Sequence, residues 1–331
     1  MDSHKTESSH IPYQAVWLGL FLLGTLSLLF IPVPSHTFFL KAVNNSGHVP
    51  LFMVVAILLV KLSRALLGRL SWPPIWHYAV AIFCVVVLAL VTEALQSLSL
   101  MRHPQASDVV HDFLGAMCGL GLLLTYDQSV AGKWARCRTF PQNRIIRLGL
   151  ALVMAMTFLP VFEWAYAYWD RASRFPSLLK FSSDWEMKFV KSFGSELQVV
   201  VSPEGWKKLP DDKVGRVVFH PKRYPGIRID EPYPDWRGYT YFQLEIFSEL
   251  PTPQLISIRI DDLHHKNKYS DRFNKAVTIS PGLNHIQIPI DDIRLAPVGR
   301  EMDLSAMKAV LLFAVNPPEE FILYVDNIRL E

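Results

Sequence analysis

The chain has 331 residues, of which 50% are hydrophobic and 19% are charged, with a formal net charge of +3. This average hides two unlike halves, because residues 1–170 carry 19 charged side chains and residues 171–331 carry 44. So few charges in the first half exclude a single soluble domain, and so many apolar residues exclude a disordered chain. The second half has 22 basic and 22 acidic residues, so we expect no nucleic-acid partner.

Five apolar stretches in the first half are long enough to cross the ~30 Å hydrocarbon layer of a bilayer as helices. We expect them at about residues 12–32, 50–67, 78–98, 109–125 and 145–164. No cleavage site of small residues follows the first stretch, so we expect a retained helix and not a signal peptide. Residues 1–170 are therefore predicted to form a multi-pass helical membrane domain with membrane lipids around it.

The short loops predict how these helices are oriented, because Lys and Arg concentrate in cytoplasmic loops. The loops after the second and fourth stretches are rich in basic residues, whereas those after the first and third contain only Lys41 and Arg102. We expect a protein of the bacterial inner membrane with a cytoplasmic N-terminus. Five crossings would then place residues 171–331 on the periplasmic, extracytoplasmic side.

Polar side chains gather at the expected outer ends of the second, third and fourth helices. Such groups are costly in a membrane and usually functional. We expect His48 to open the second helix just before Pro50, a favoured first-turn residue. Each group alone could cap or neutralise a helix end, but independent caps would not all collect on one side. We interpret as one ligand-binding cluster the residues His48, Glu93, Gln96, Arg102, Asp108 and Asp112.

Two glycines continue the face of the fourth helix that begins with Asp112. Gly115 and Gly119 are four residues apart, a spacing of small residues that lets another helix approach closely. We expect this face to pack inward and to take the carboxyl groups of Asp108 and Asp112 with it.

The segment EALQSLSLMRHPQASDVVHDFLGAMCGL, residues 93–120, resembles the VanZ-like family. The family pattern is Glu-x-x-Gln, an Arg in a short loop, and Asp-x-x-x-Asn-x-x-Gly-x-x-x-Gly. This sequence departs from it at Asp112, where the family usually has Asn. His48 in NNSGHVPLF looks like the His that opens the second helix of that family. The resemblance covers about residues 35–126 and implies a role in the cell envelope, since the family is associated with reduced susceptibility to glycopeptide antibiotics.

The polar cluster is compatible with binding and with catalysis. A His, three carboxylates and an Arg would suffice for acid–base chemistry on a phosphate or ester, with Arg102 holding the anion. The same residue types would bind a polar head group, and the membrane half contains no Gly-x-Ser-x-Gly motif and no spacing typical of metal ligands. A lipid-linked or anionic envelope ligand and a membrane enzyme acting on a lipid-linked phosphate or glycan ester therefore both stay open.

After Asp170 the apolar residues alternate with polar ones, which is typical of half-buried strands. Turn residues separate short strands that we expect at residues 215–220, 241–247, 255–260, 285–290, 310–315 and 321–325. This pattern favours an all-β sandwich of jelly-roll type. We place it at residues 184–331, after a linker at residues 171–183.

The order of landmarks in this half resembles the galactose-binding-like jelly rolls of carbohydrate-binding modules. WRGY precedes the strand YFQLEIF, SIRIDD follows, and GLNHIQIPIDDI leads to the final YVDNIRLE. In several such modules the Asp of the final strand helps to hold a structural calcium ion. The resemblance therefore implies calcium at Asp326, and we expect no other cofactor.

Residues 261–274 are the most polar part of this half and lie between two expected strands. Polar side chains on a loop above a rigid sandwich are suited to glycan binding, although a solvated hairpin with local salt bridges explains them as well. The candidate residues for a glycan site are His264, His265, Tyr269, Asp271, Arg272 and Asn274.

The leading hypothesis is an inner-membrane protein with a ligand cluster in its helices and a glycan-binding periplasmic sandwich. The sandwich could instead dock an envelope protein, which would make the chain a non-catalytic assembly subunit. These alternatives make different demands, because an assembly subunit would tolerate loss of the polar cluster and an enzyme would not.

Overall fold

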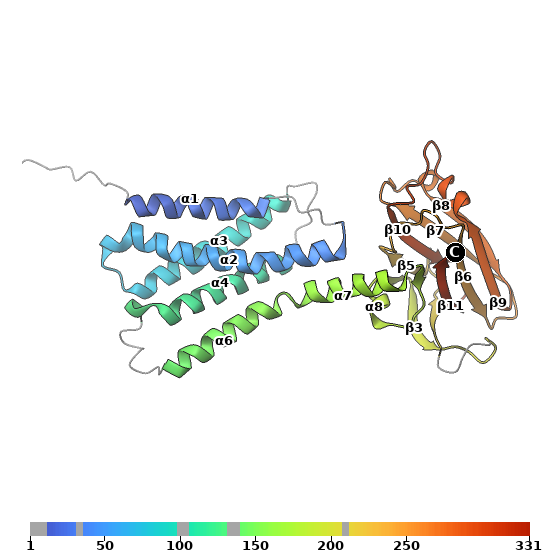
Figure 1. The fold of residues 1–331 in the computed structure, drawn as a ribbon, viewed down its shortest axis with the longest axis horizontal. Helices are drawn as coiled ribbons and strands as arrows, with labels where there is room; N and C mark the ends of the chain where they lie inside the picture. Colours follow the sequence, from blue (N-terminus) through green and yellow to red (C-terminus); the bar gives the residue numbers. More distant parts are fainter. Residues whose placement is uncertain (1–11, 31–35, 98–105, 131–139, 207–211) are drawn as a thin grey trace, which may run out of the picture. The chain divides into compact units, whose positions relative to one another are not determined.

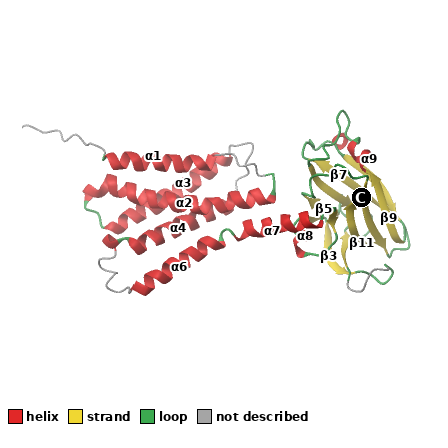
Figure 2. Cartoon of the chain, in the orientation of Figure 1, coloured by secondary structure: helices red, strands yellow, loops and turns green. Residues whose placement is uncertain are grey.

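The computed structural model describes residues 12–30, 36–97, 106–130, 140–206 and 212–331. The chain divides after Trp164 into two compact units. The first consists of helices, and the second consists mainly of strands, as the colours of Figure 2 show. The predicted division into a helical half and an all-β half is confirmed.

The first unit consists of helices that Figure 1 shows in chain order from blue to green. In chain order they are α1 (Tyr13–Ser27), η1 (Leu28–Phe30), α2 (Phe38–Leu67), η2 (Gly68–Leu70), α3 (Pro74–Ser97), α4 (Ala106–Tyr126) and α6 (Phe140–Met156), and α7 (Leu159–Arg174) continues into the second unit. In the described part of the chain, four helical segments are apolar and long enough to cross a membrane: Phe38–Leu70, Pro74–Thr92, Val109–Tyr126 and Asn143–Arg174. Because α1 has only 15 residues, crossing by five helices stays a prediction.

Helix α2 begins at Phe38, well before the start that we expected near Pro50. The side chain of Thr37 caps it by accepting a hydrogen bond from the Leu40 amide at 3.2 Å. Pro50 therefore lies inside the helix, where its ring removes one backbone hydrogen bond. His48 accordingly lies in the middle of α2 and does not open it.

Helix α4 packs against α2 through the two glycines that the sequence singled out. A Cβ atom on Gly115 would lie 2.1 Å from the Val49 carbonyl oxygen, and one on Gly119 would lie 2.5 Å from that of Met53. Only a residue without a side chain fits at these two points. The two helices also enclose the core of this unit, in which Phe52 and Ala56 are fully buried.

The last expected membrane helix, residues 145–164, is divided into α6 and α7. The helical hydrogen bonding changes at Thr157 and Phe158, and Pro160 stands in the first turn of α7, where a missing amide proton costs least. Helix α7 is also longer than expected, because it runs through Asp170 to Arg174. The boundary that we placed at residue 170 therefore falls inside a helix.

The second unit is a β-sandwich of two antiparallel sheets. The six-stranded sheet has the order β3-β4-β11-β6-β9 with β1 beside β11, and the five-stranded sheet has the order β2-β5-β10-β7-β8. The strands of the first sheet are β1 (Ser177–Leu179), β3 (Ser195–Val201), β4 (Lys213–Phe219), β6 (Tyr241–Ser248), β9 (Gly282–Pro289) and β11 (Phe321–Leu330). Those of the second are β2 (Val190–Phe193), β5 (Gly226–Asp230), β7 (Gln254–Asp262), β8 (Phe273–Ile279) and β10 (Met307–Phe313).

The hydrophobic core of this unit lies between the two sheets. Trp236, Phe242 and Ile258 are fully buried in it. Because the chain crosses from one sheet to the other after most strands, the connections pass over the ends of the sandwich. Short helical turns stand in some of these connections: α8 (Asp184–Met187), η3 (Tyr269–Asp271) and α9 (Ile290–Arg294).

The segment that we expected to be a linker, residues 171–183, belongs to the sandwich unit. Strand β1 lies in it and pairs with β11, with Ser177 opposite Arg329. Leu179 and Phe181 are buried in the core. The sequence of this segment gives no strand pattern because β1 has only three residues.

We predict that Gly115→Ala lowers the stability of the helical unit by about 1–3 kcal/mol, the usual cost of overpacking. The added methyl group would overlap the α2 backbone, which cannot move as a side chain can. The melting temperature of the detergent-solubilised protein measures the effect. Gly149→Ala on α6, where nothing lies within 4 Å of an added Cβ atom, is the control, and an equal loss in both variants would contradict the packing.

Candidate functional site

The outer face of the five-stranded sheet is defined by the strands that bury its other face. On β7 the side chains of Ile256, Ile258 and Ile260 point into the core and are fully buried. Because successive side chains of a strand point to opposite faces, Ser257 and Arg259 face outward. The same alternation applies to β10, on which Leu312 faces the core and Phe313 faces outward.

The strand register assembles these outward positions into rows across the sheet. Phe193 of β2 lies opposite Gly226 of β5, which lies opposite Phe313 of β10. Ser257 of β7 and Ala276 of β8 complete the row. The two aromatic side chains of this row have no side chain between them, because the residue between them is Gly226. No larger residue fits there, since a Cβ atom on Gly226 would lie 2.2 Å from the Leu312 carbonyl oxygen.

The next row carries cationic and amide groups. It consists of Lys191, Arg228, Leu311, Arg259 and Asn274, in order across the five strands. Asp261, two residues after Arg259 on the same strand, accepts its hydrogen bonds at 2.7–3.0 Å. The pairing holds the guanidinium group of Arg259 along the surface of the sheet.

A depression of about 660 Å³ lies over these rows. Tyr224, before β5, and Tyr269, in η3, line it and are 47% and 73% exposed. The Tyr224 ring meets that of Phe313 edge to face, with 6.0 Å between ring centres. The guanidinium carbon of Arg272 lies 5.3 Å from the ring centre of Tyr269. Aromatic faces and hydrogen-bond donors are thus presented together on the sheet.

The polar segment 261–274 divides between this depression and a buried network beside it. Tyr269, Arg272 and Asn274 line the depression. The His265 side chain is 3% exposed, and its Nδ1 atom donates to the Asp271 carbonyl oxygen at 2.8 Å while its Nε2 atom accepts from Arg259 at 3.0 Å. His265 therefore supports Arg259 from behind and does not reach the depression.

The two other predicted residues of this segment make ion pairs. Asp271 bonds to Arg300, whose guanidinium group also donates to the fully buried Asp262 at 2.9 Å. The backbone amide of Lys266 and the Arg300 guanidinium hold the pKa of Asp271 below its ordinary value. His264 lies 3.3 Å from Asp303. These contacts fix the loop that carries Tyr269.

Sequence analysis did not identify several residues of the depression. They are Phe193, Ser257, Arg259, Lys275, Leu311 and Phe313, together with Val315. The alternation within the predicted strands at 255–260 and 310–315 contained the signal, because its outward positions include Ser257, Arg259, Leu311 and Phe313. Which strands lie next to one another is not visible in that alternation.

The predicted membrane cluster is described in part. His48 Nδ1 and Asp112 Oδ1 lie 2.8 Å apart, and both side chains are buried between α2 and α4. Glu93 and Gln96 lie on α3 and Asp108 lies on α4, but their side chains are outside the described residues, as is Arg102 altogether. The pairing of His48 with Asp112 is the part of the cluster that the structure shows.

A depression of about 180 Å³ lies next to His48. Leu28 and Leu29 of η1 form one wall, and α2 forms the other with Val43, Asn44, Gly47 and Leu51. An imidazole group thus lines a mainly apolar opening. Its Nδ1 atom contacts Asp112, so the Asp112 carboxyl group orients the ring.

Other polar contacts between helices were not predicted, and two groups of them join α2 to its neighbours. Ser63 Oγ lies 2.9 Å from His77 Nδ1, and both residues are buried. Asp127, which follows α4, accepts hydrogen bonds from Arg64 and from Tyr78. These residues join the C-terminal end of α2 to α3 and to the end of α4. They lie about four turns of α2 away from His48.

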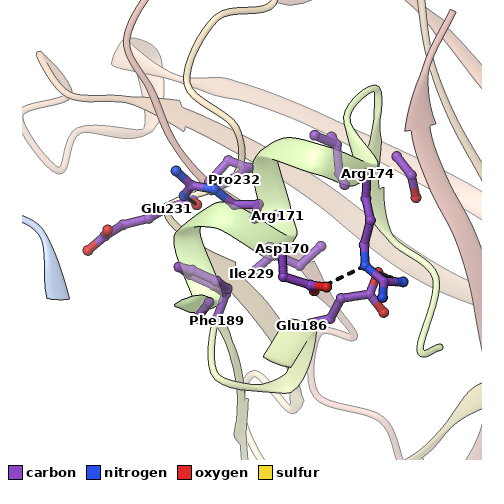
Figure 3. A pocket seen from close by; sticks show the side chains of 11 residues that line it. Asp170, Arg171, Arg174, Glu186, Phe189, Ile229, Glu231 and Pro232 are labelled. Carbon is purple, nitrogen blue, oxygen red and sulfur yellow. Dashed lines mark hydrogen bonds and ion pairs between the residues drawn. The ribbon is translucent and has the colours of Figure 1, made fainter. Parts of the chain in front are cut away.

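A third cluster joins the end of α7 to the sandwich (Figure 3). Arg174 donates to Asp170 at 3.0 Å, lies 3.8 Å from Glu186 and donates to Ser182 at 2.6 Å. Tyr168 bonds to the Glu231 carboxylate and Arg171 to its carbonyl oxygen. The cavity between them is about 10 Å³, enough for about one water molecule. We regard this cluster as structural.

The predicted metal site remains without support from the arrangement of side chains. In the described ranges, no group of three or more His, Cys, Asp or Glu side chains is arranged to hold a metal ion. Asp326 lies on β11, is 1% exposed and pairs in register with Glu245 of β6. A calcium ion there would need backbone oxygens as ligands and stays a prediction.

Neither a family model nor a curated protein matches the chain. The family 11 carbohydrate-binding module from Clostridium thermocellum, solved with a β-1,3-1,4-mixed-linked tetrasaccharide, is 16% identical, and the match covers 43% of this chain and 88% of that one, with a TM-score of 0.34. The family 11 module of a cellulosomal cellulase of the same organism is 17% identical over 46% of this chain and 92% of its own, with a TM-score of 0.35.

An exo-β-agarase is 14% identical over 47% of this chain, with a TM-score of 0.39, and this chain spans only 25% of it. At these identities and scores the matches say nothing of what this chain binds. The resemblance to the VanZ-like family stays a prediction. Of the predicted jelly roll, the β-sandwich is confirmed by the two sheets themselves.

We predict that Arg174→Met destabilises the sandwich more at pH 7.5 than at pH 5. Burial already raises the pKa of Glu186 above its ordinary value, and loss of the guanidinium group would raise it further. Since the folded state then binds the Glu186 proton more tightly than the unfolded state, stability is lost as the pH rises through the raised pKa. We expect a loss of about 1–3 kcal/mol near neutral pH.

Amide hydrogen exchange of β1 and β11 in the full chain measures this loss, after correction for the intrinsic effect of pH. Arg329→Met, which removes an exposed guanidinium group from β11, is the control. A loss that is equal at both pH values would contradict the role of the buried carboxylates.

Proposed function

We propose that the chain is a membrane-anchored glycan-binding protein whose ligand lies on the outer face of the five-stranded sheet. The observation that carries the proposal is the depression of about 660 Å³ lined by Tyr224, Tyr269, Arg259 and Asn274. Its volume falls within the usual range of ligand sites, about 300–1,000 Å³. Most of its residues lie on a sheet whose other face is buried, which keeps the floor of the site rigid.

The chemistry of the lining matches that of a sugar ring. A pyranose has an apolar face of C–H groups and a rim of hydroxyl groups, so it stacks on aromatic rings and accepts hydrogen bonds from fixed donors. Tyr224 and Phe313 supply the rings, and Arg259 and Asn274 supply the donors.

The four long apolar helices support the membrane part of the proposal. Most of their side chains are not buried in the structure, and some apolar ones are largely exposed, including Phe83 at 70% and Leu90 at 58%. Apolar helices with such exposed faces fit a lipid surrounding. In this account the helices hold the chain in the inner membrane, and the sandwich meets envelope glycans on the periplasmic side.

We predict that Tyr224→Ala and Tyr269→Ala each weaken glycan binding about tenfold, a loss of about 1.4 kcal/mol, because each change removes an aromatic ring on which a sugar can stack. Affinity electrophoresis of the detergent-solubilised full chain in gels containing soluble polysaccharides measures the binding. Tyr241→Ala is the matched control, because Tyr241 lies on the outer face of the six-stranded sheet.

The proposal fails if no polysaccharide retards the chain, or if the control weakens binding as much as the two variants do. If the chain binds no glycan but retains an envelope protein, and Tyr224→Ala abolishes that retention, the assembly subunit is favoured instead.

We propose in addition that the His48–Asp112 pair binds the head group of a lipid-linked or anionic envelope ligand. The specific observation is that His48 lines a mainly apolar depression of about 180 Å³ while its ring is oriented by a buried carboxyl group. An acyl chain suits the apolar wall, and a polar head group suits the imidazole. The other residues of the predicted cluster, Arg102 among them, would complete the site.

Mass spectrometry of co-purified lipids tests this second proposal. We expect a specific lipid with the native chain and at least a tenfold loss of it in His48→Leu. Asp112→Asn keeps a hydrogen-bonding group beside His48 and is expected to retain the lipid. The same lipids in all three proteins would mean that the pair is only a structural contact. A variant that keeps the lipid but no longer converts it would favour the membrane enzyme.

A further inference from the structure

The lining of the large depression on the sandwich is cationic. Arg259, Arg272 and Lys275 all line it, and none of the residues that line it is an Asp or Glu. Because the second half of the chain has as many acidic as basic residues, this is a local excess of positive charge. A site for a neutral sugar would not need it, since hydroxyl groups are bound as well by uncharged donors.

Only one of these three cations has its charge balanced by a carboxylate within ion-pair distance. Arg259 pairs with Asp261, whose side chain is 3% exposed, at 2.7 Å. In the part of the chain that the structure describes, no carboxylate oxygen lies within 4 Å of Arg272 or Lys275. Because Lys275 alternates with the outward-facing Asn274 and Ala276 on β8, its side chain is directed away from the outer face. The guanidinium charge of Arg272 therefore remains at the depression after the internal pairing.

Arg272 carries a further sign of an absent anionic partner. Its Nε atom is inaccessible to solvent and makes no hydrogen bond within the described residues. A buried and unpaired N–H group costs free energy, which favours a turn of the Arg272 side chain toward an anion in the depression. Burial and the nearby guanidinium group of Arg259 lower the pKa of Arg272, and the Asp261 carboxylate opposes this only in part, so an anion beside Arg272 would favour its charged form.

The geometry points to an anionic glycan, with carboxylate, sulfate or phosphate groups, as the ligand of the depression over the five-stranded sheet. The inference rests on the glycan-binding function proposed above and narrows it to a class of substrate. A guanidinium group forms paired, charge-assisted hydrogen bonds with such groups. Arg272, which has no ion-pair partner, binds the anion in this arrangement, while the ring of the sugar stacks on Tyr224 and Phe313.

The experiment compares polymers that differ in charge alone. Polygalacturonate is tested against its fully methyl-esterified form, and dextran sulfate against dextran, by affinity electrophoresis of the full chain. We expect at least one anionic polymer to bind at least tenfold more tightly than its neutral counterpart. We also expect this preference to fall as the salt concentration rises, since ionic contacts are screened. The first pair reports a carboxylate ligand and the second reports a sulfate or phosphate ligand.

Two variants separate this site from general attraction of a polyanion. Arg272→Gln is expected to lose the preference for the anionic polymer by about tenfold while Tyr224→Ala loses affinity for both polymers. Arg216→Gln removes a cation from β4 in the six-stranded sheet and should change nothing. Equal loss in Arg272→Gln and Arg216→Gln would overturn the inference.

The two proposals fail differently in this experiment. Equal binding of charged and neutral polymers that Tyr224→Ala abolishes would overturn the anionic preference and leave the glycan site standing. No binding of any of these polymers, or of the polysaccharides used above, would overturn both.

Discussion

The burial of one face of the five-stranded sheet determines what its other face presents. Ile256, Ile258 and Ile260 fill the core from β7, and a strand alternates its side chains strictly, so Ser257 and Arg259 must face outward. A slip of one residue would bury the Arg259 guanidinium group and expose three isoleucines, at a cost of several kcal/mol. The register that holds the core together therefore also fixes the rows that form the proposed glycan site.

The buried network beside the sheet extends this constraint to the loop. Asp262 is fully buried and holds Arg300, Arg300 holds Asp271, and Asp271 accepts from His265 through its carbonyl oxygen. A buried carboxylate of this kind must be paired, so the loop that carries Tyr269 has few other conformations available. The polar residues that are not in the depression thus have a clear structural role.

In the helical unit the corresponding constraint is that two residues of α4 at its contact with α2 are glycines and have no side chain. Gly115 and Gly119 allow α4 to touch the backbone of α2, and this contact is what brings Asp112 within 2.8 Å of His48. Polar side chains in a membrane are stable when they pair with one another. The glycines and the polar pair therefore form one arrangement, in which close packing makes the hydrogen bond possible.

Much of this could be predicted from the sequence. The spacing of Gly115 and Gly119 gave the helix contact, and the alternation after Asp170 gave six of the strands. The start of α2 could not be predicted, because Pro50 is a strong signal for a first turn and its tolerance inside a helix depends on neighbouring helices. The depression could not be predicted either. Phe193 and Phe313 are 120 residues apart in the chain, and they lie in one row only because both β2 and β10 pair with β5 at Gly226.

A glycan bound on the outer face of the five-stranded sheet would shield the backbone amides beneath it. Hydrogen–deuterium exchange of the full chain, with and without a polysaccharide that it binds, detects this shielding. We expect slower exchange in β7, β8 and β10 and in the loop around Tyr269, with β4 and β9 of the other sheet unchanged. Protection confined to the six-stranded sheet, or to the helices, would contradict binding on this face.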